Sequence, residues 1–198
     1  MKCLTLFELF NLTDILEWIG AISGLLGVWL TMRRNIWCFP IGLVNVSISA
    51  YLFFESNLFA DTLQQFVFAI LIVYGWISWR NVPNIQLPPV SRMSVKSRFG
   101  YIAIASATGL GLGTFLHIYT TAHYPYVDAM LTSFCFVGQF LIAKRKIENW
   151  HIWIFTNAGY VMLYVVKDLY VYSALYLVYF VMAFWGLKQW QSELRHGK

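Results

Sequence analysis

Residues 146–190 read KIENWHIWIFTNAGYVMLYVVKDLYVYSALYLVYFVMAFWGLKQW, two long apolar runs separated by the pair Lys167 and Asp168. A helix needs about 20 predominantly apolar residues to cross the hydrocarbon core of a bilayer, and about 17 are enough for the shortest. The pattern therefore predicts two transmembrane helices, over 149–166 and 169–187. A chain built on such segments has lipid as its solvent.

Five further apolar stretches precede these two helices. They cover 18–32, 35–54, 62–79, 99–116 and 129–143. Apolar residues make up 59% of the 198 residues and charged residues 12%, whereas about a quarter of an ordinary globular chain is charged. We therefore expect an all-α integral membrane protein, a single membrane domain over 1–198 with seven transmembrane helices.

The basic residues predict the orientation of these helices, because Lys and Arg stay on the cytoplasmic side of a membrane. With the N-terminus outside, 12 of the 14 basic residues lie inside, and most acidic residues lie outside. The inner residues are Arg33, Arg34, Arg80, Arg92, Lys96, Arg98, Lys144, Arg145, Lys146, Lys188, Arg195 and Lys198. Scattered in this way, they form no face for nucleic acid. We expect no nucleic-acid partner and a cytoplasmic C-terminus.

The beginning of the chain, MKCLTLFELFNLTD, has no basic region followed by an apolar run and a cleavage site of small residues. It therefore does not resemble a cleaved secretory signal. We expect the first apolar segment to act as an uncleaved insertion signal, which directs the protein to a plasma membrane with membrane lipid around it.

The chain also contains a weak internal repeat, expressed as a few aligned polar and small residues. Shifts of 114, 112 and 111 residues align the pairs Asp14/Asp128, Gly24/Gly138, Asn35/Asn149, then Asn45/Asn157, then Gly75/Gly186 and Trp79/Trp190. Chance identity in a biased composition is the alternative. We expect two parallel repeats in a 3+1+3 arrangement, as in some transporters: repeat one about 14–79, a linking helix about 99–116 and repeat two about 126–190.

Polar side chains in a lipid-embedded helix face the bundle interior, so they indicate a substrate pathway. In the predicted helix 149–166 they recur every three or four residues and share one face: Asn149, Trp153, Asn157, Tyr160 and Tyr164. The indole of Trp153 suits a flat, cationic ring. Asn157, near the middle of the membrane, offers both a donor and an acceptor. We predict that this face binds a small molecule.

Amides and tyrosines on other helices complete the predicted site. They are Gln64 and Gln65 in 62–79, Asn45 in 35–54, Gln139 in 129–143, and Tyr176 in the face Tyr172, Tyr176 and Tyr179. Hydrogen bonding between helices is an equal alternative for the amides. Aromatic packing is an equal alternative for the tyrosines.

Three tryptophans lie near the inner ends of the predicted helices. Trp150 fits either the substrate site or an anchor at the membrane interface, where tryptophan is enriched. For Trp79 and Trp190 we expect the interfacial position.

Enzymatic signatures are missing from the sequence, which contains no HExxH, GxSxG or GxxxxGK[ST]. Cys3, Cys38 and Cys135 have no spacing typical of a metal site, and we expect neither a cofactor nor catalysis. A membrane enzyme or haem protein using His117, His123 or His151 is the alternative of a different class, and a purely structural membrane subunit is another. No acid is predicted in the middle of the membrane, which favours facilitated diffusion over ion coupling.

The stretch LFADTLQQFVFAILIVYGWISW at 58–79 and the stretch quoted above resemble the PnuC family of bacterial vitamin transporters. The resemblance runs from about Asp14 to Trp190, and the WxxW of Trp150 and Trp153 is its most specific element. One departure is YGWISW, where family members commonly have another aromatic residue after the first Trp. By position Trp150, Trp153, Asn157 and Gln65 match the binding helices of the family, with Asn45 less clearly matched.

The resemblance implies a relative of the SWEET architecture in a bacterial inner membrane, often a homotrimer. Such proteins admit nicotinamide riboside, thiamine or riboflavin without an energy source, and a cytoplasmic kinase traps the vitamin by phosphorylation. Nicotinamide riboside is the first expectation, and thiamine or riboflavin is the alternative. Nicotinamide riboside and thiamine both carry a flat cationic ring suited to tryptophan and amides.

Overall fold

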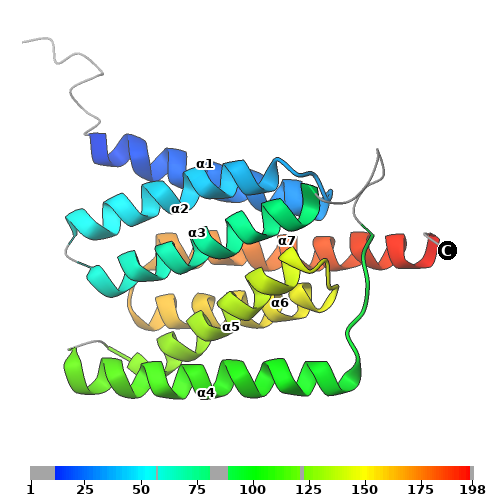
Figure 1. The fold of residues 1–198 in the computed structure, drawn as a ribbon. Coiled ribbons are helices and arrows are strands. Elements are labelled where there is room, and N and C mark those ends of the chain that lie inside the picture. Colours follow the sequence, from blue (N-terminus) through cyan, green and yellow to red (C-terminus); the bar gives the residue numbers. More distant parts are fainter. Residues whose placement is uncertain (1–11, 57, 81–88, 121–122, 197–198) are drawn as a thin grey trace, which may run out of the picture.

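The computed structural model describes residues 12–56, 58–80, 89–120 and 123–196. In these segments the chain forms seven helices and no strand (Figure 1). The helices are α1 (Leu12–Met32), α2 (Cys38–Glu55), α3 (Phe59–Arg80), α4 (Val95–Tyr119), α5 (Pro125–Ala143), α6 (Glu148–Val166) and α7 (Tyr170–His196). The predicted all-α class with seven helices is therefore confirmed.

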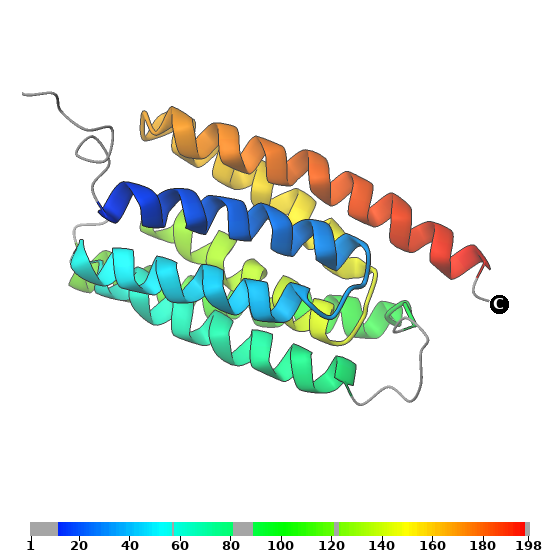
Figure 2. The ribbon, with the colours of Figure 1, turned by 90° about the horizontal axis from the view of Figure 1, so that it is seen from above.

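The helices form two triplets and one separate helix. Helix α2 contacts α1 and α3, and α6 contacts α5 and α7, while α3 meets α5 and α1 meets α7 across the centre. Figures 1 and 2 show that α1 to α3 run in the same directions as α5 to α7. Helix α4 lies at the edge and packs on α5.

Three helices end in the same turn, closed by a residue in the left-handed conformation. Arg34, Arg145 and Asp168 have φ angles of 55°, 56° and 58°. After each of them the next backbone N–H donates to a carbonyl five residues back, as Asn35 does to Leu30 at 2.9 Å, which satisfies a terminal carbonyl of the helix. Glycine is the usual residue at this position, because other residues lose about 1–2 kcal/mol there.

The two arginines in these turns have contacts that offset this loss. Arg34 Nη2 lies 2.7 Å from Glu193 Oε2 on α7. Arg145 Nη1 donates to the Ser78 carbonyl on α3 at 3.0 Å. Each arginine thus ties the turn of one triplet to the last helix of the other.

Two tryptophans make a matching pair of contacts at the same end of the bundle. Trp79 on α3 donates its Nε1–H to the Ile142 carbonyl at 3.2 Å. Trp190 on α7 donates to the carbonyls of Thr31 and Met32 at 3.3 and 3.1 Å. The two indoles are 3% and 0% exposed, so they are buried between helices and the expected role as belt residues facing the lipid is wrong for both. They satisfy carbonyls at the ends of α5 and α1, which have no partner inside their own helices.

These paired contacts are separated by 111 residues throughout: Arg34 and Arg145, Thr31 and Ile142, Trp79 and Trp190. The sequence repeat paired the first helix of each triplet at a spacing of 114 residues instead. That spacing differs from 111 by about one helical turn. Small and polar residues recur with the helical period, so an alignment shifted by one turn also matches such residues. The common spacing supports two parallel repeats, which we propose as the symmetry of the bundle.

Helix α4 meets α5 through a stripe of small residues. Ala105, Gly109 and Gly113 are buried at intervals of four residues, and a side-chain carbon added at Gly109 would lie 3.0 Å from the Met130 Cα. Small residues at this spacing let two membrane helices approach closely. The linking helix, expected over 99–116, extends at both ends to Val95 and Tyr119.

Six of the seven helices are long and apolar enough to cross a membrane by length and composition. Helix α6 is the exception within the described residues, because Glu148, Asn149, His151 and Asn157 lower its hydropathy. Large apolar side chains such as Ile70, Met162 and Val171 face outward from the bundle. Seven predicted spans thus correspond to seven helices, of which six meet the apolar criterion.

The α4–α5 contact predicts the effect of enlarging one glycine. We expect Gly109→Leu to lower the melting temperature of the purified protein by several degrees, since overpacking costs about 1–3 kcal/mol. Gly111→Leu is the matched control, because nothing lies within 4 Å of a carbon added at Gly111. Thermal unfolding in one detergent compares the two variants. Equal melting temperatures would contradict the proposed contact.

Candidate functional site

The middle of α6 carries the polar residues from which the site is built. Asn157 lies halfway along the 19 residues of α6 and is 5% exposed. No hydrogen bond joins its amide to another described residue. Trp153 and Tyr160 lie about one turn before and after it on the same face. A buried amide without a protein partner is poised to bond a ligand, because burial without a partner is unfavourable.

Trp153 lies against α5 at Gly138. A side-chain carbon at Gly138 would meet the indole at 3.3–3.4 Å, so the missing side chain lets the ring approach the α5 backbone. The indole Nε1–H of Trp153 is buried and has no acceptor among the described residues. The ring thus brings one unused donor to the centre of the bundle.

Trp153 and Phe68 connect two groups of packed side chains. One group lies toward the basic end and includes Trp79, Trp150 and Trp190. The other consists of Leu131, Cys135, Tyr160 and Leu163. Both Trp153 on α6 and Phe68 on α3 pack against each group. They therefore mark the place where the first triplet meets the second.

Tyrosines from α6 and α7 continue from this place along the bundle. The ring of Tyr176 lies 4.8 Å from that of Tyr160, 5.2 Å from that of Tyr164 and 5.8 Å from that of Tyr179. Tyr164 also contacts Tyr172 at 5.7 Å. We name Tyr160, Tyr164, Tyr172, Tyr176 and Tyr179 the tyrosine cluster. The structure thus brings together the three predicted tyrosines, with Tyr172 and Tyr179 beside them.

A short hydrogen-bonded chain joins three helices beside this cluster. Thr132 Oγ1 on α5 lies 3.2 Å from the Tyr160 hydroxyl and 3.4 Å from Gln64 Oε1 on α3. Gln64 therefore has a bond between helices, which was the alternative to a ligand-facing role. Sequence reasoning missed Thr132, since a single threonine in an apolar helix commonly bonds its own backbone.

Gln65 and Gln139 lie beside a contact between α3 and α5. The rings of Phe68 and Phe136 lie 5.1 Å apart, and each glutamine lies three residues from one of these rings, on the same helical face. Both amides are partly buried. Their role in binding stays a prediction.

Asn45 makes a contact between helices near the edge of the site. Its Nδ2 donates to the Gly20 carbonyl on α1 at 2.7 Å. A side chain at Gly24 would collide with the Tyr179 hydroxyl and approach Asn45 Nδ2, so α1, α2 and α7 meet here. Sequence reasoning named Tyr179 only as part of the tyrosine face of α7, and it left Phe68 out of the site although Phe68 shares a helical face with Gln65.

Trp150 lies apart from Trp153, in the group toward the basic end. Its ring meets that of Trp190 edge to face, with centroids 5.6 Å apart, and an added carbon at Gly186 would overlap it. Because Trp150 is 2% exposed, its ring packs inside the bundle, and the alternative of an anchor that faces the lipid headgroups is wrong. Its buried Nε1–H also has no acceptor among the described residues. A role for Trp150 in binding stays a prediction.

The histidines of the alternative hypothesis lie at opposite ends. His117 near the end of α4 contacts the Tyr126 ring, and His123 precedes α5, whereas His151 belongs to the first turns of α6. In the described part of the chain no three His, Cys, Asp or Glu residues form a group able to hold a metal ion. Cys38 and Cys135 are buried, and Cys3 lies outside the described residues.

Known proteins share this sequence pattern and this fold. Residues 14–192 match the family described as nicotinamide mononucleotide transporter. The nicotinamide riboside transporter PnuC of Escherichia coli (strain K12) is 24% identical over 91% of this chain and 86% of its own length. The riboflavin/roseoflavin transporter RibM of Streptomyces davaonensis is 23% identical over 90% and 85%. The crystal structure of the vitamin B3 transporter PnuC has a TM-score of 0.78 at 20% identity, covering 96% of this chain and 86% of that chain.

The bond between Thr132 and Tyr160 predicts a modest effect on stability. Tyr160→Phe removes the hydroxyl, and we expect a loss of about 0.5–1.5 kcal/mol, seen as a lower melting temperature. Tyr170→Phe is the control, because that hydroxyl donates to Asp168 at 2.9 Å on the exposed surface. An equal loss in both variants would contradict the buried bond.

Proposed function

The chain belongs to the nicotinamide mononucleotide transporter family, and on this premise we propose that it carries nicotinamide riboside across a bacterial inner membrane by facilitated diffusion. It is a multi-pass membrane protein and a transporter, not an enzyme. The observation that carries the choice of substrate is the pair Trp153 and Asn157: the Trp153 Nε1–H is buried without an acceptor, and Asn157 is 5% exposed and has no hydrogen-bond partner among the described residues.

The chemistry of nicotinamide riboside fits this pair. Its pyridinium ring is flat and cationic, so stacking on the Trp153 indole is favourable. Its carboxamide has a donor and an acceptor, which match the amide of Asn157. The hydroxyls of the tyrosine cluster, with Gln65 and Gln139, would bond the ribose.

Acidic residues at the end of the bundle near the tyrosine cluster support a cationic substrate. Asp61 and Asp128 belong to the first turns of α3 and α5. Lys167 Nζ lies 3.5 Å from Asp128 Oδ2, and both groups are within electrostatic range of Asp61. Two carboxylates against one ammonium leave a negative charge, which raises the local concentration of a cation. We propose that this end faces outside.

The opposite end holds the basic residues and, in our proposal, faces the cytoplasm, as does the C-terminus. All basic residues predicted to be cytoplasmic lie toward it, except Lys198, which lies outside the described residues. A cytoplasmic kinase would phosphorylate the vitamin after passage and prevent its return. In the described residues the buried charged groups are Arg34 and Glu148, both at helix ends. A protein without a charge in the middle of the membrane fits transport without ion coupling.

A homotrimer remains part of this proposal. An apolar groove of about 490 Å³ on the outer faces of α2 and α3 is lined mainly by Tyr51, Phe54, Phe59, Leu63 and Phe66. Aromatic residues are enriched where protein surfaces meet. The groove supports a subunit contact on this side.

Riboflavin is the second candidate substrate, because one relative is named a riboflavin/roseoflavin transporter. Its three-ring system is larger and uncharged, and the tyrosine cluster offers a broad aromatic surface for it. Thiamine, a cation like nicotinamide riboside, is a further alternative. Thermal shifts with all three vitamins rank them, because a ligand stabilises the state that it binds.

The proposed stacking predicts the effect of removing one indole. We expect Trp153→Ala to weaken nicotinamide riboside binding about tenfold, since a desolvated contact between a cation and an indole is worth up to about 2 kcal/mol. Trp185→Ala is the control, because Trp185 is 62% exposed on α7. Titration calorimetry measures both variants. Unchanged affinity in Trp153→Ala would exclude the stacking.

Facilitated diffusion predicts the end point of uptake. In proteoliposomes without an ion gradient, labelled nicotinamide riboside should reach the outside concentration and stop there. With a nicotinamide riboside kinase and ATP enclosed, the label should accumulate above that level as a phosphate ester. Accumulation without the kinase, driven by an imposed proton or sodium gradient, would contradict the proposal.

A further inference from the structure

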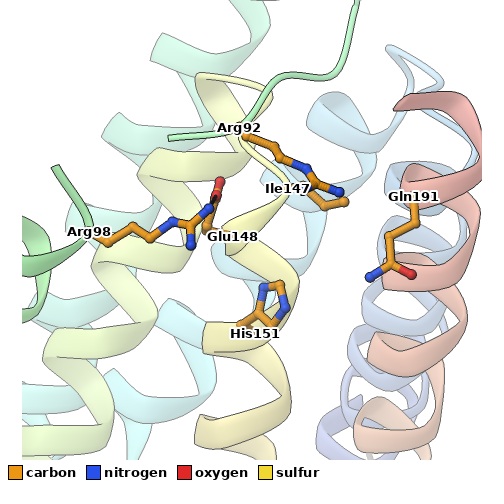
Figure 3. Close-up of a pocket in the computed structure, with 6 residues that line it drawn as sticks. All are labelled: Arg92, Arg98, Ile147, Glu148, His151 and Gln191. Carbon is orange, nitrogen blue, oxygen red and sulfur yellow. Dashed lines mark hydrogen bonds and ion pairs between the residues drawn. The ribbon is translucent and has the colours of Figure 1, made fainter. Parts of the chain in front are cut away.

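A polar pocket lies at the basic end of the bundle, at the start of α6. It has a volume of about 200 Å³ and is lined by Arg92, Arg98, Ile147, Glu148, His151 and Gln191. Figure 3 shows these side chains around one space, with Arg92 reaching across from the segment before α4 and Gln191 facing it from α7. A single water needs only about 10–15 Å³ of such space. The lining includes neither Trp153 nor Asn157, so this is a second site.

Backbone and side-chain bonds fix the walls of this pocket. The Ser91 N–H donates to the Arg145 carbonyl, and the Ile147 N–H donates to the Ser91 carbonyl, both at 3.0 Å. Lys146 Nζ donates to Ser91 Oγ at 2.9 Å. The segment that carries Arg92 is thus held against the turn between α5 and α6. The backbone on this side of the pocket is therefore held in place, which lowers the entropy lost when a ligand binds.

Glu148 is the acidic residue that lines the pocket, and its carboxylate already has partners within the protein. Its Oε1 and Oε2 both accept from the Met93 N–H at 3.1 Å, and Oε1 lies 2.8 Å from Arg98 Nη2. The pair Glu148 and Arg98 is therefore neutral as a whole. It positions the arginine at the edge of the pocket.

Arg92 supplies a positive charge that no acidic residue of the pocket balances. It has no hydrogen-bond or ion-pair partner among the described residues. His151 and Gln191 add donors on the opposite walls (Figure 3). A planar guanidinium with several N–H groups matches the oxygens of a phosphate, and such charge-assisted bonds are about twice as strong as neutral ones. The pocket thus combines an anchored backbone, excess positive charge and donors from three segments.

We propose that this pocket binds a phosphate group. Two sources share that chemistry: the headgroup of an acidic phospholipid, and a soluble phosphate on the same side of the membrane. A bound phosphate would connect the segment before α4 with α6 and α7, in addition to the packing of α4 on α5. The proposal goes beyond vitamin transport and does not depend on which vitamin is carried.

The test compares two variants that remove the same charge. Arg92→Gln removes the guanidinium from the pocket, and Arg80→Gln removes an exposed one from the last turn of α3, outside the lining. One arm adds inorganic phosphate to protein in phosphatidylcholine nanodiscs, at ionic strength held constant with sodium chloride. The other arm replaces phosphatidylcholine by phosphatidylglycerol without added phosphate. Melting temperature is read in both arms.

We expect wild type and Arg80→Gln to be stabilised in at least one arm, and Arg92→Gln to lose that stabilisation, with phosphate binding about tenfold weaker where titration is possible. His151→Asn should reduce it as well. Stabilisation by phosphate identifies a soluble ligand, and stabilisation by phosphatidylglycerol alone identifies a lipid. Trp153→Ala should keep the response, so failure of the vitamin site would not remove it. If Arg92→Gln responds like Arg80→Gln in both arms, the proposal is wrong.

Discussion

The indoles of Trp79 and Trp190 hold the two triplets together, because each donates a hydrogen bond to a carbonyl at the end of a helix in the other triplet. A helix that ends at the membrane surface leaves its last carbonyls without partners, and in a nonpolar surrounding each unpaired group is costly. Here the last helix of each triplet supplies the donor for the first helix of the other. Arg34 and Arg145 add a second crossed pair in the same layer. The basic end is therefore tightly bonded.

The opposite half of the bundle is built differently. Beyond Trp153 the tyrosine cluster joins α6 to α7 within the second triplet, while Phe68 and Gln64 link α3 to α5 through the Phe136 ring and the Thr132 hydroxyl. The proposed vitamin site lies at the border between the bonded half and the aromatic half.

Much of this fold follows from the sequence, because lipid imposes simple rules on it. Each long apolar stretch became a helix, and the buried amide of Asn157 was found because a polar residue in an apolar run is conspicuous. Other features could not be predicted. Tryptophan suits both a membrane interface and a buried bond to a carbonyl, so the environment of Trp79 was misjudged. Phe68 is one phenylalanine among 16, and its central position depends on how α3 is rotated against α5.

The polarity of α6 connects the fold with the proposed function. It is the helix that fails the apolar criterion, yet it is enclosed by neighbours, and its polar residues Asn149, Thr156 and Asn157 are buried. A purely structural helix in this place would gain stability from apolar residues, since polar groups without partners weaken the packing. Asn157 and the Trp153 indole nevertheless have no bond to any described residue through their amide and N–H groups. A transporter has a reason to keep such groups unsatisfied: bonds that the empty protein already made would compete with those of the substrate.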